Sequence, residues 1–136
     1  MHIKKIITFL PVLFVILFSP VASSQEKILS NIEINNFVIA LSVEELVPQG
    51  VSTTFASSVS RLYAFCEIKG ALEEINIMHM WYYKEKLMAT VKLPVNSKSW
   101  RTYSSKNILP EWRGQWRVDA TTEDGLVLYT SEFEIE

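Results

Sequence analysis

The chain has 136 residues, of which 49% are hydrophobic and 21% charged, with a net charge of −2 and one cysteine. This length provides enough apolar surface for the core of one small domain. Mild acidity without a basic block argues against a nucleic-acid partner. Because Cys66 is alone, an intrachain disulfide is excluded, and its apolar strand favours a buried thiol over a reactive one.

Residues 1–23 have the order of a secretory signal peptide. Two lysines precede the apolar run Ile6–Phe18, and small residues follow at Val21–Ser24. We predict cleavage after Ser23 or Ser24, which places the mature protein in the periplasm or outside the cell. Removal of the two lysines shifts the net charge from −2 to −4.

An uncleaved membrane anchor is the alternative interpretation of this segment. The stretch Ile6–Ala22 has 17 residues, at the lower end of the range that spans a bilayer, and it contains a proline. Such an anchor is the only membrane link that we predict. Residues 24–31 are polar and are predicted to form a disordered lead into one domain over residues 32–136.

Hydrophobic periodicity predicts seven β-strands and no helix. Residues alternate most clearly in Leu62–Ile68 and Ile75–Tyr83, and Lys84–Lys86 connects the latter to Leu87–Val95 as a hairpin. The segment Glu44–Ser58 contains proline and glycine and is predicted to be a long loop. The seven predicted strands cover residues 32–43, 62–68, 75–83, 87–95, 100–104, 115–121 and 126–135.

Turn signals separate these strands at short, regular intervals. Ser105–Trp112 is predicted to be a loop, and Asp124-Gly125 is typical of a tight hairpin turn. Seven strands at this spacing favour an all-β fold, a two-layer antiparallel β-sandwich of the immunoglobulin-like kind. A small closed β-barrel is the alternative.

Five short motifs mark the mature chain, namely Tyr63-x-Phe65, His79-x-Trp81, Trp100-Arg101-x-x-Ser104-Ser105-Lys106, Gly114-x-Trp116-x-Val118 and Asp124-Gly125. Together they resemble the bacterial domain-of-unknown-function family 2914, over roughly Ile34 to Glu136. The resemblance implies a small all-β module, exported or attached to membrane regions, with no assigned activity. The turn at Lys84-Glu85 departs from the Asn-Gly type that the family leads us to expect.

His79 is the first candidate for a functional residue. It shares strand parity with Trp81, so its ring is predicted to point into the core, with Glu67, Ser104 or Ser105 as hydrogen-bond partner. A Ser-His-Glu set would allow nucleophilic catalysis, but no nucleophile elbow or glycine-rich oxyanion turn accompanies it. We therefore favour a neutral structural histidine. The ligand spacing of a zinc site is also missing from the sequence.

The four tryptophans are the second candidate. Trp81 and Trp116 lie mid-strand at apolar positions and are predicted to be in the core. Trp100 and Trp112 lie beside charged residues, and exposed rings there would suit a protein loop, a peptide or a sugar. For Trp112, the alternative is that its ring caps one end of the sandwich.

Arg101 and Lys106 are the third candidate, because they flank a Ser-Ser pair predicted to lie at a turn just past a strand. Both cations can donate hydrogen bonds to a carboxylate or a phosphate. The alternative is structural: Arg101 pairs with Glu67 or Asp119 across strands.

These patterns favour a binding module over an enzyme. The leading hypothesis is an exported bacterial domain that contacts an envelope protein, and the alternative is a carbohydrate-binding module that recognises a glycan through exposed rings. A hydrolase using His79 is the least favoured, and we predict no catalytic residue, metal or cofactor. The predicted binding residues are Trp100, Arg101, Tyr103, Ser104, Ser105, Lys106 and Trp112. The predicted structural core contains Phe65, His79, Trp81, Trp116 and Val118.

Overall fold

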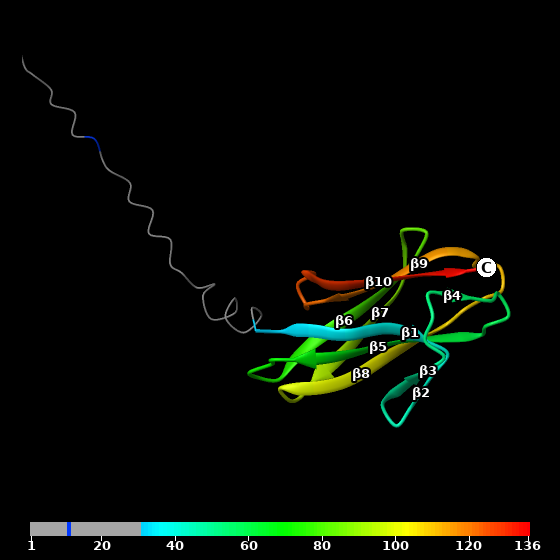
Figure 1. Cartoon of the computed structure of the whole chain (residues 1–136). Helices are drawn as coiled ribbons and strands as arrows, with labels where there is room; N and C mark the ends of the chain where they lie inside the picture. The colour runs from blue at the N-terminus through cyan, green and yellow to red at the C-terminus, as the bar shows by residue number, and fades with distance from the viewer. Residues whose placement is uncertain (1–10, 12–30) are drawn as a thin grey trace, which may run out of the picture.

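The computed structural model describes Pro11 and residues 31–136 (Figure 1). The predicted signal peptide, except for Pro11, and the predicted disordered lead, except for Asn31, lie outside the described residues. In the described part, no helix is long and apolar enough to cross a membrane. The strands of this part are β1 Glu33–Ala40, β2 Ser42–Glu44, β3 Val47–Gln49, β4 Thr54–Phe55, β5 Arg61–Lys69, β6 Ile75–Tyr83, β7 Lys86–Val95, β8 Ser99–Asn107, β9 Gly114–Thr121 and β10 Val127–Ile135.

Two sheets form the layers of a β-sandwich (Figure 1). One has three strands in the order β1-β5-β8, and the other has five in the order β4-β10-β9-β6-β7. A third, two-stranded sheet is the β2–β3 hairpin, which lies against β1 and β5. The closed-barrel alternative is wrong, because no ladder joins the two layers within residues 31–136.

The seven long strands follow the immunoglobulin-like order with one difference. Counted along the chain, the first, second and fifth long strands share one sheet, and the third, sixth and seventh share the other. In an immunoglobulin constant domain the fourth strand joins the first sheet, whereas here β7 pairs with β6. The predicted fold class is confirmed, and all seven predicted strands are present.

The prediction of seven strands in a purely antiparallel fold was incomplete. The segment expected to be a loop contains β3 and β4, and β2 forms where the first predicted strand was to end. β4 pairs in parallel with β10, with Thr54 opposite Glu134. These strands have two or three residues each, too few for a period-2 pattern to reveal.

Positive backbone angles determine two of the connections. Lys84 and Glu85 have φ of 45° and 68°, the geometry of a two-residue hairpin turn, so β7 begins at Lys86, one residue before the prediction. Gly70 has a φ of 85°, and a Cβ there would lie 1.8 Å from the carbonyl oxygen of Asn31. Only glycine therefore lets the chain enter β1 so close to the end of β5.

The main core lies between the two sheets and is centred on aromatic rings. Trp81 and Trp116 are 0% and 2% exposed, as the sequence predicted. The Phe133 ring contacts both, edge-on to Trp81 at 6.3 Å and stacked on Trp116 at 5.9 Å between centroids. His79 and Val118 are also buried in this layer.

Phe65 is buried on the other side of the three-stranded sheet. Its neighbours in β5, Ala64 and Cys66, face the main core, so the alternation of a strand turns Phe65 outward. Cross-strand register places it between Val38 of β1 and Tyr103 of β8. Phe65 is thus a core residue of the outer face, 2% exposed, and not of the space between the sheets.

Candidate functional site

Three strands bring Cys66, His79 and Ser104 together inside the sandwich. The Nδ1 atom of His79 lies 2.7 Å from the Ser104 hydroxyl oxygen, and Nε2 lies 3.4 Å from the Cys66 sulfur. The indole N–H of Trp81 donates to the same Ser104 oxygen at 3.0 Å. The ring of Phe37 packs on the imidazole, with centroids 5.1 Å apart. Both ring nitrogens of His79 therefore have partners.

Burial keeps both titratable groups of this cluster neutral. It lowers the pKa of His79 to about 3 and raises the pKa of the Cys66 thiol to about 12. A general base works best with a pKa near the operating pH, and a thiol must ionise to attack. Both side chains are fully enclosed, so the cluster has the properties of a structural polar network.

Of the three partners considered for His79, the structure selects Ser104. Glu67 faces the opposite side of its sheet, where its carboxylate forms an ion pair with Arg101 and accepts a hydrogen bond from Asn36, each at 3.0 Å. A Ser-His-Glu set is therefore not formed. In residues 31–136 no group of three His, Cys, Asp or Glu side chains is arranged to hold a metal ion.

The predicted binding residues are divided between two faces, because their segment is one regular strand. β8 continues to Asn107 and pairs with β5 at every position, so Ser104 and Ser105 lie mid-strand and not at a turn. Cross-strand partners share a face. Trp100, Ser104 and Lys106 lie opposite the core residues Ile68, Ala64 and Leu62, whereas Arg101, Tyr103 and Ser105 lie opposite Glu67, Phe65 and Tyr63.

Trp112 is half-buried at one end of the sandwich and is not an exposed anchor. Its ring packs on Trp116 with centroids 6.0 Å apart, and its carbonyl accepts the Trp116 indole hydrogen bond at 3.0 Å. The ammonium of Lys106 lies 5.1 Å from the Trp112 ring centroid. This geometry agrees with the alternative in which Trp112 caps one end of the sandwich, and the Lys106 ammonium lies over its ring.

The outer face of the three-stranded sheet carries an exposed aromatic and basic surface. Tyr63 of β5 and Tyr103 of β8 lie with ring centroids 5.9 Å apart, and the Arg61 guanidinium lies 6.0 Å from the Tyr63 ring. Tyr103 is 41% exposed, and Arg101 extends beside Glu67 with 53% of its side chain exposed. We call Arg61, Tyr63, Arg101 and Tyr103 the Tyr–Arg surface.

Sequence reasoning identified only half of the Tyr–Arg surface. Arg101 and Tyr103 were predicted binding residues, but Arg61 and Tyr63 were not. The alternation of Leu62–Ile68 had already placed Tyr63 on the outer side of its strand. The missing information was the pairing of β5 with β8, 30 to 46 positions apart along the chain, which periodicity does not reveal.

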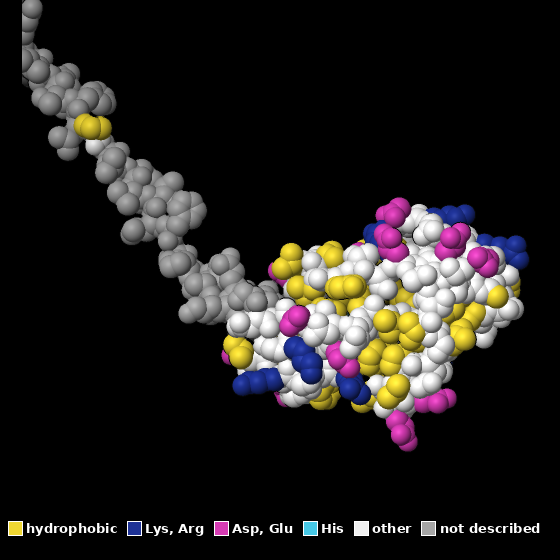
Figure 2. Space-filling view, in the orientation of Figure 1, with side chains coloured by type: hydrophobic (Ala, Val, Ile, Leu, Met, Phe, Trp, Pro, Cys, Tyr) yellow, Lys and Arg dark blue, Asp and Glu magenta, His cyan; other side chains and the backbone are white. Residues whose placement is uncertain are grey.

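The sign of charge distinguishes this sheet from the chain as a whole. Its three strands carry four cations, Arg61, Lys69, Arg101 and Lys106, against the carboxylates of Glu33 and Glu67. The complete chain has a net charge of −2. Figure 2 shows Lys and Arg side chains over the layer of β1, β5 and β8. This sheet is a local basic region on an acidic protein.

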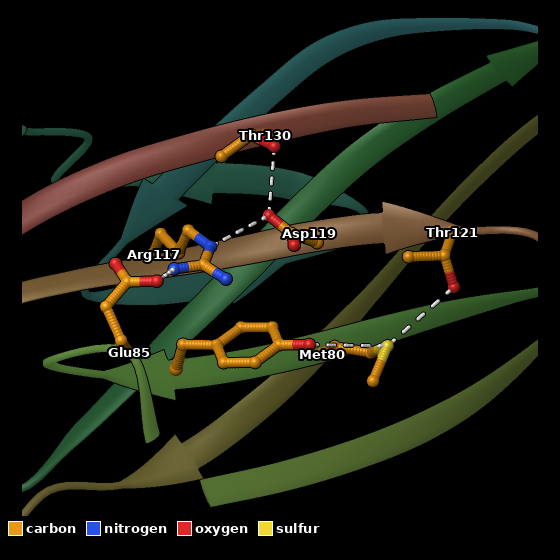
Figure 3. A network of polar contacts seen from close by, with 7 residues as sticks. Met80, Glu85, Arg117, Asp119, Thr121 and Thr130 are labelled. Carbon is orange, nitrogen blue, oxygen red and sulfur yellow. Dashed lines mark hydrogen bonds and ion pairs between the residues drawn. The ribbon is translucent and has the colours of Figure 1, made fainter. Parts of the chain in front are cut away.

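A polar network covers the outer face of the five-stranded sheet (Figure 3). Arg117 hydrogen-bonds Glu85 and lies 3.4 Å from Asp119, whose carboxylate also accepts a hydrogen bond from Thr130 at 2.9 Å. The hydrogen bond to Glu85, together with the two negative charges, raises the pKa of Arg117. Its guanidinium stacks 4.0 Å from the Tyr82 ring centroid. These groups satisfy one another, which favours a structural role.

A shallow pocket beside this network has mixed charge. Lys84 and Arg117 line it together with Glu85 and Glu132. Because two cations and two carboxylates line it, the pocket has no net charge that would favour a ligand of either sign. The Tyr–Arg surface is therefore the better candidate for recognition.

A family model matches part of the chain. The model of the family described as "Protein of unknown function (DUF2914)" matches residues 74–135, which confirms the resemblance. The match is narrower than the expected span from Ile34 to Glu136, since β1 to β5 lie outside it. No curated protein matches the sequence. The segment from β6 to the end of β10 is therefore similar to the family DUF2914, whose description assigns no activity.

Proposed function

We propose that this protein is an exported, non-catalytic domain that binds a partner protein through the Tyr–Arg surface. The observation that carries the proposal is the pairing of two tyrosines and two arginines on one open sheet face. Tyrosine and arginine are enriched among residues that dominate protein–protein binding energy. Phe65, the cross-strand partner of Tyr103, is buried on the same face.

The interior cluster supports the non-catalytic part of the proposal. His79 is neutral over the physiological pH range and enclosed, and its partners Cys66 and Ser104 are enclosed with it. A substrate would have to open the sandwich to reach any of these atoms. This enclosure favours a structural role for the contacting histidine, serine and cysteine over a catalytic one.

A glycan is the less favoured partner. Flat sugar rings stack best on exposed aromatic rings that lie in one plane. The rings of Tyr63 and Tyr103 are inclined to each other by 58°, so they do not form one flat platform. Two rings in contact at this angle form an uneven surface, against which a protein side chain or loop can pack, and this favours a protein partner.

Export is supported by the sequence of residues 1–23, with its lysines, apolar run and small residues. In this proposal the domain works in the bacterial periplasm or outside the cell and meets an envelope protein there. The family resemblance, which implies an exported or membrane-attached module, is consistent with this location.

Site-specific photo-crosslinking in living cells tests the contact surface. A photoreactive phenylalanine derivative replaces Tyr103 in one variant and Tyr129 of β10 in a matched control. The two positions are similarly exposed, at 41% and 46%, but lie on different sheets. We expect a protein adduct from position 103 in the envelope fraction and little from position 129.

Loss of that adduct on Arg101→Glu in the position-103 variant would support the role of the Tyr–Arg surface. Equal yields from both positions would indicate non-specific proximity, and adducts from position 129 alone would contradict the proposal. Recovery of the protein in the cytoplasmic fraction would contradict export.

A further inference from the structure

The outer strands of the two sheets differ in how well they resist pairing with another chain. β1 has a register shift between Asn35 and Val38, with φ of 49° at Asn36, which interrupts its hydrogen-bonding edge. β7 contains Pro94 and two lysines. The edge of β10 is covered by β4, which has only two residues. Bulges, prolines, charges and short edge strands are the usual means of preventing edge-to-edge association.

β8 lacks the bulge, the proline and the covering strand. It pairs with β5 over nine consecutive positions, from Ser99 to Asn107, without a shift in register. In the described part of the chain its other edge has no ladder partner. A long, regular strand of this kind presents a row of main-chain N–H and C=O groups that another strand can pair with.

The charged side chains of β8 limit which strands can pair with it. Arg101 and Lys106 are its charged residues, and it contains no carboxylate. Like charges brought together across strands destabilise pairing, so a second copy of β8 is disfavoured. A carboxylate on the outer face of an incoming strand would instead lie near Arg101, and one on the inner face near Lys106, and opposite charges speed association and improve specificity.

We propose that β8 is the docking edge for an extended, carboxylate-bearing segment of a partner protein, which adds to the three-stranded sheet as a fourth strand. The inference rests on the proposed function and specifies its partner. Main-chain hydrogen bonds to β8 provide the attachment. Alternate side chains of the added strand lie on the outer face beside Arg101, Tyr103 and Ser105, and these determine specificity.

Synthetic nine-residue peptides test this inference on the full-length exported protein. The parent peptide alternates Glu and Val, and a control carries Lys in place of each Glu. Two further peptides keep the parent sequence but are N-methylated, one at every Glu and the other at every Val. In strand addition only one edge of the peptide faces β8, and the main-chain N–H groups of alternate residues point to that edge. Methylation therefore removes the hydrogen bonds to β8 in only one of these two peptides.

Isothermal titration should give at least about tenfold weaker binding for one methylated peptide and little change for the other, because several main-chain hydrogen bonds are lost together. The Lys peptide should also bind at least about tenfold more weakly than the parent. In nuclear magnetic resonance spectra, alternate amides of residues 99–107 should exchange with solvent more slowly when the parent peptide is bound.

Equal binding of both methylated peptides would overturn strand addition, whereas the proposed function would stand if Tyr63 and Tyr103 resonances still shift. Equal binding of the Lys peptide would overturn the acidic partner. Absence of peptide binding would also overturn the inference, and concentration-dependent self-association that protects β8 amides would identify a second copy as the occupant.

Discussion

The two faces of the three-stranded sheet are formed by the same strands but differ in polarity and accessibility. The inner face of β5 and β8 contributes Cys66 and Ser104 to a closed network with His79. The outer face contributes Tyr63 and Tyr103 to an open surface. Neighbouring residues such as Tyr103 and Ser104 thus have opposite surroundings, at 41% and 3% exposure. The direction of the side chain, and not its place in the sequence, decides its role.

The two faces also differ in the role of their residues: inner residues stabilise the fold, and outer residues are those we propose to bind a partner. Polar groups between the sheets are hydrogen-bonded, and in the described residues no buried side-chain nitrogen or oxygen lacks a partner. Removing one of them leaves the others unsatisfied, which costs free energy. On the outer face, water can replace a lost contact. Substitutions inside should therefore affect folding, and substitutions outside should affect binding.

The largest effect is expected for Trp81→Ala. The variant loses a fully buried ring and one hydrogen bond to Ser104, so the free energy of unfolding should fall by about 3–5 kcal/mol. Denaturant titration monitored by circular dichroism measures this change. Trp100→Ala, at a half-buried position, is the control and should cost less. A loss below about 1 kcal/mol for Trp81→Ala would contradict its place in the core.

A pH-dependent effect is expected for His79. Its pKa is about 3 in the folded protein and 6.5 in the unfolded reference, so between these values only the unfolded chain binds the proton. The stabilisation is complete above pH 6.5 and decreases as the pH falls, by up to about 1.4 kcal/mol for each pH unit. Denaturant midpoints of wild type and His79→Gln between pH 7 and 4 measure this dependence.

The glutamine variant cannot titrate, so its stability should depend less steeply on pH over this interval. Surface carboxylates titrate in both proteins, and their contribution cancels in the difference between the curves. Parallel curves would mean that His79 is reached by protons in the folded state, contrary to its enclosure.

The smallest effects on stability are expected for substitutions of Trp112 and Tyr103. Trp112 packs on Trp116, so Trp112→Ala should lower the free energy of unfolding by about 1–2 kcal/mol, less than for a fully buried ring. Tyr103→Ala should lower it by only about 0.5 kcal/mol while weakening capture of the partner protein in a pull-down. Thermal unfolding of the two variants compares them. A stable Trp112→Ala protein that has lost its partner would restore Trp112 as a contact residue.

Local pattern was sufficient to predict the long strands and the residues of the core. Alternation in Ile75–Tyr83 put His79 and Trp81 on one side, and both are buried. The pattern failed at β8, where Ser-Ser-Lys indicated a turn. A ladder with β5 keeps these residues extended, since the main-chain groups that face β5 have partners across the sheet. Local propensity gave way to a tertiary hydrogen-bond ladder.

The sequence by itself determined the all-β class, the seven long strands and the inward direction of His79, because these depend on residues two positions apart along one strand. Only the tertiary structure decided that Ser104 and Cys66 are the partners of His79, that Arg61 and Tyr63 lie beside Arg101 and Tyr103, and that β8 has an unpaired edge. These contacts join residues from distant parts of the chain, and strand order and register, which fix them, are set by the packing of the whole sandwich.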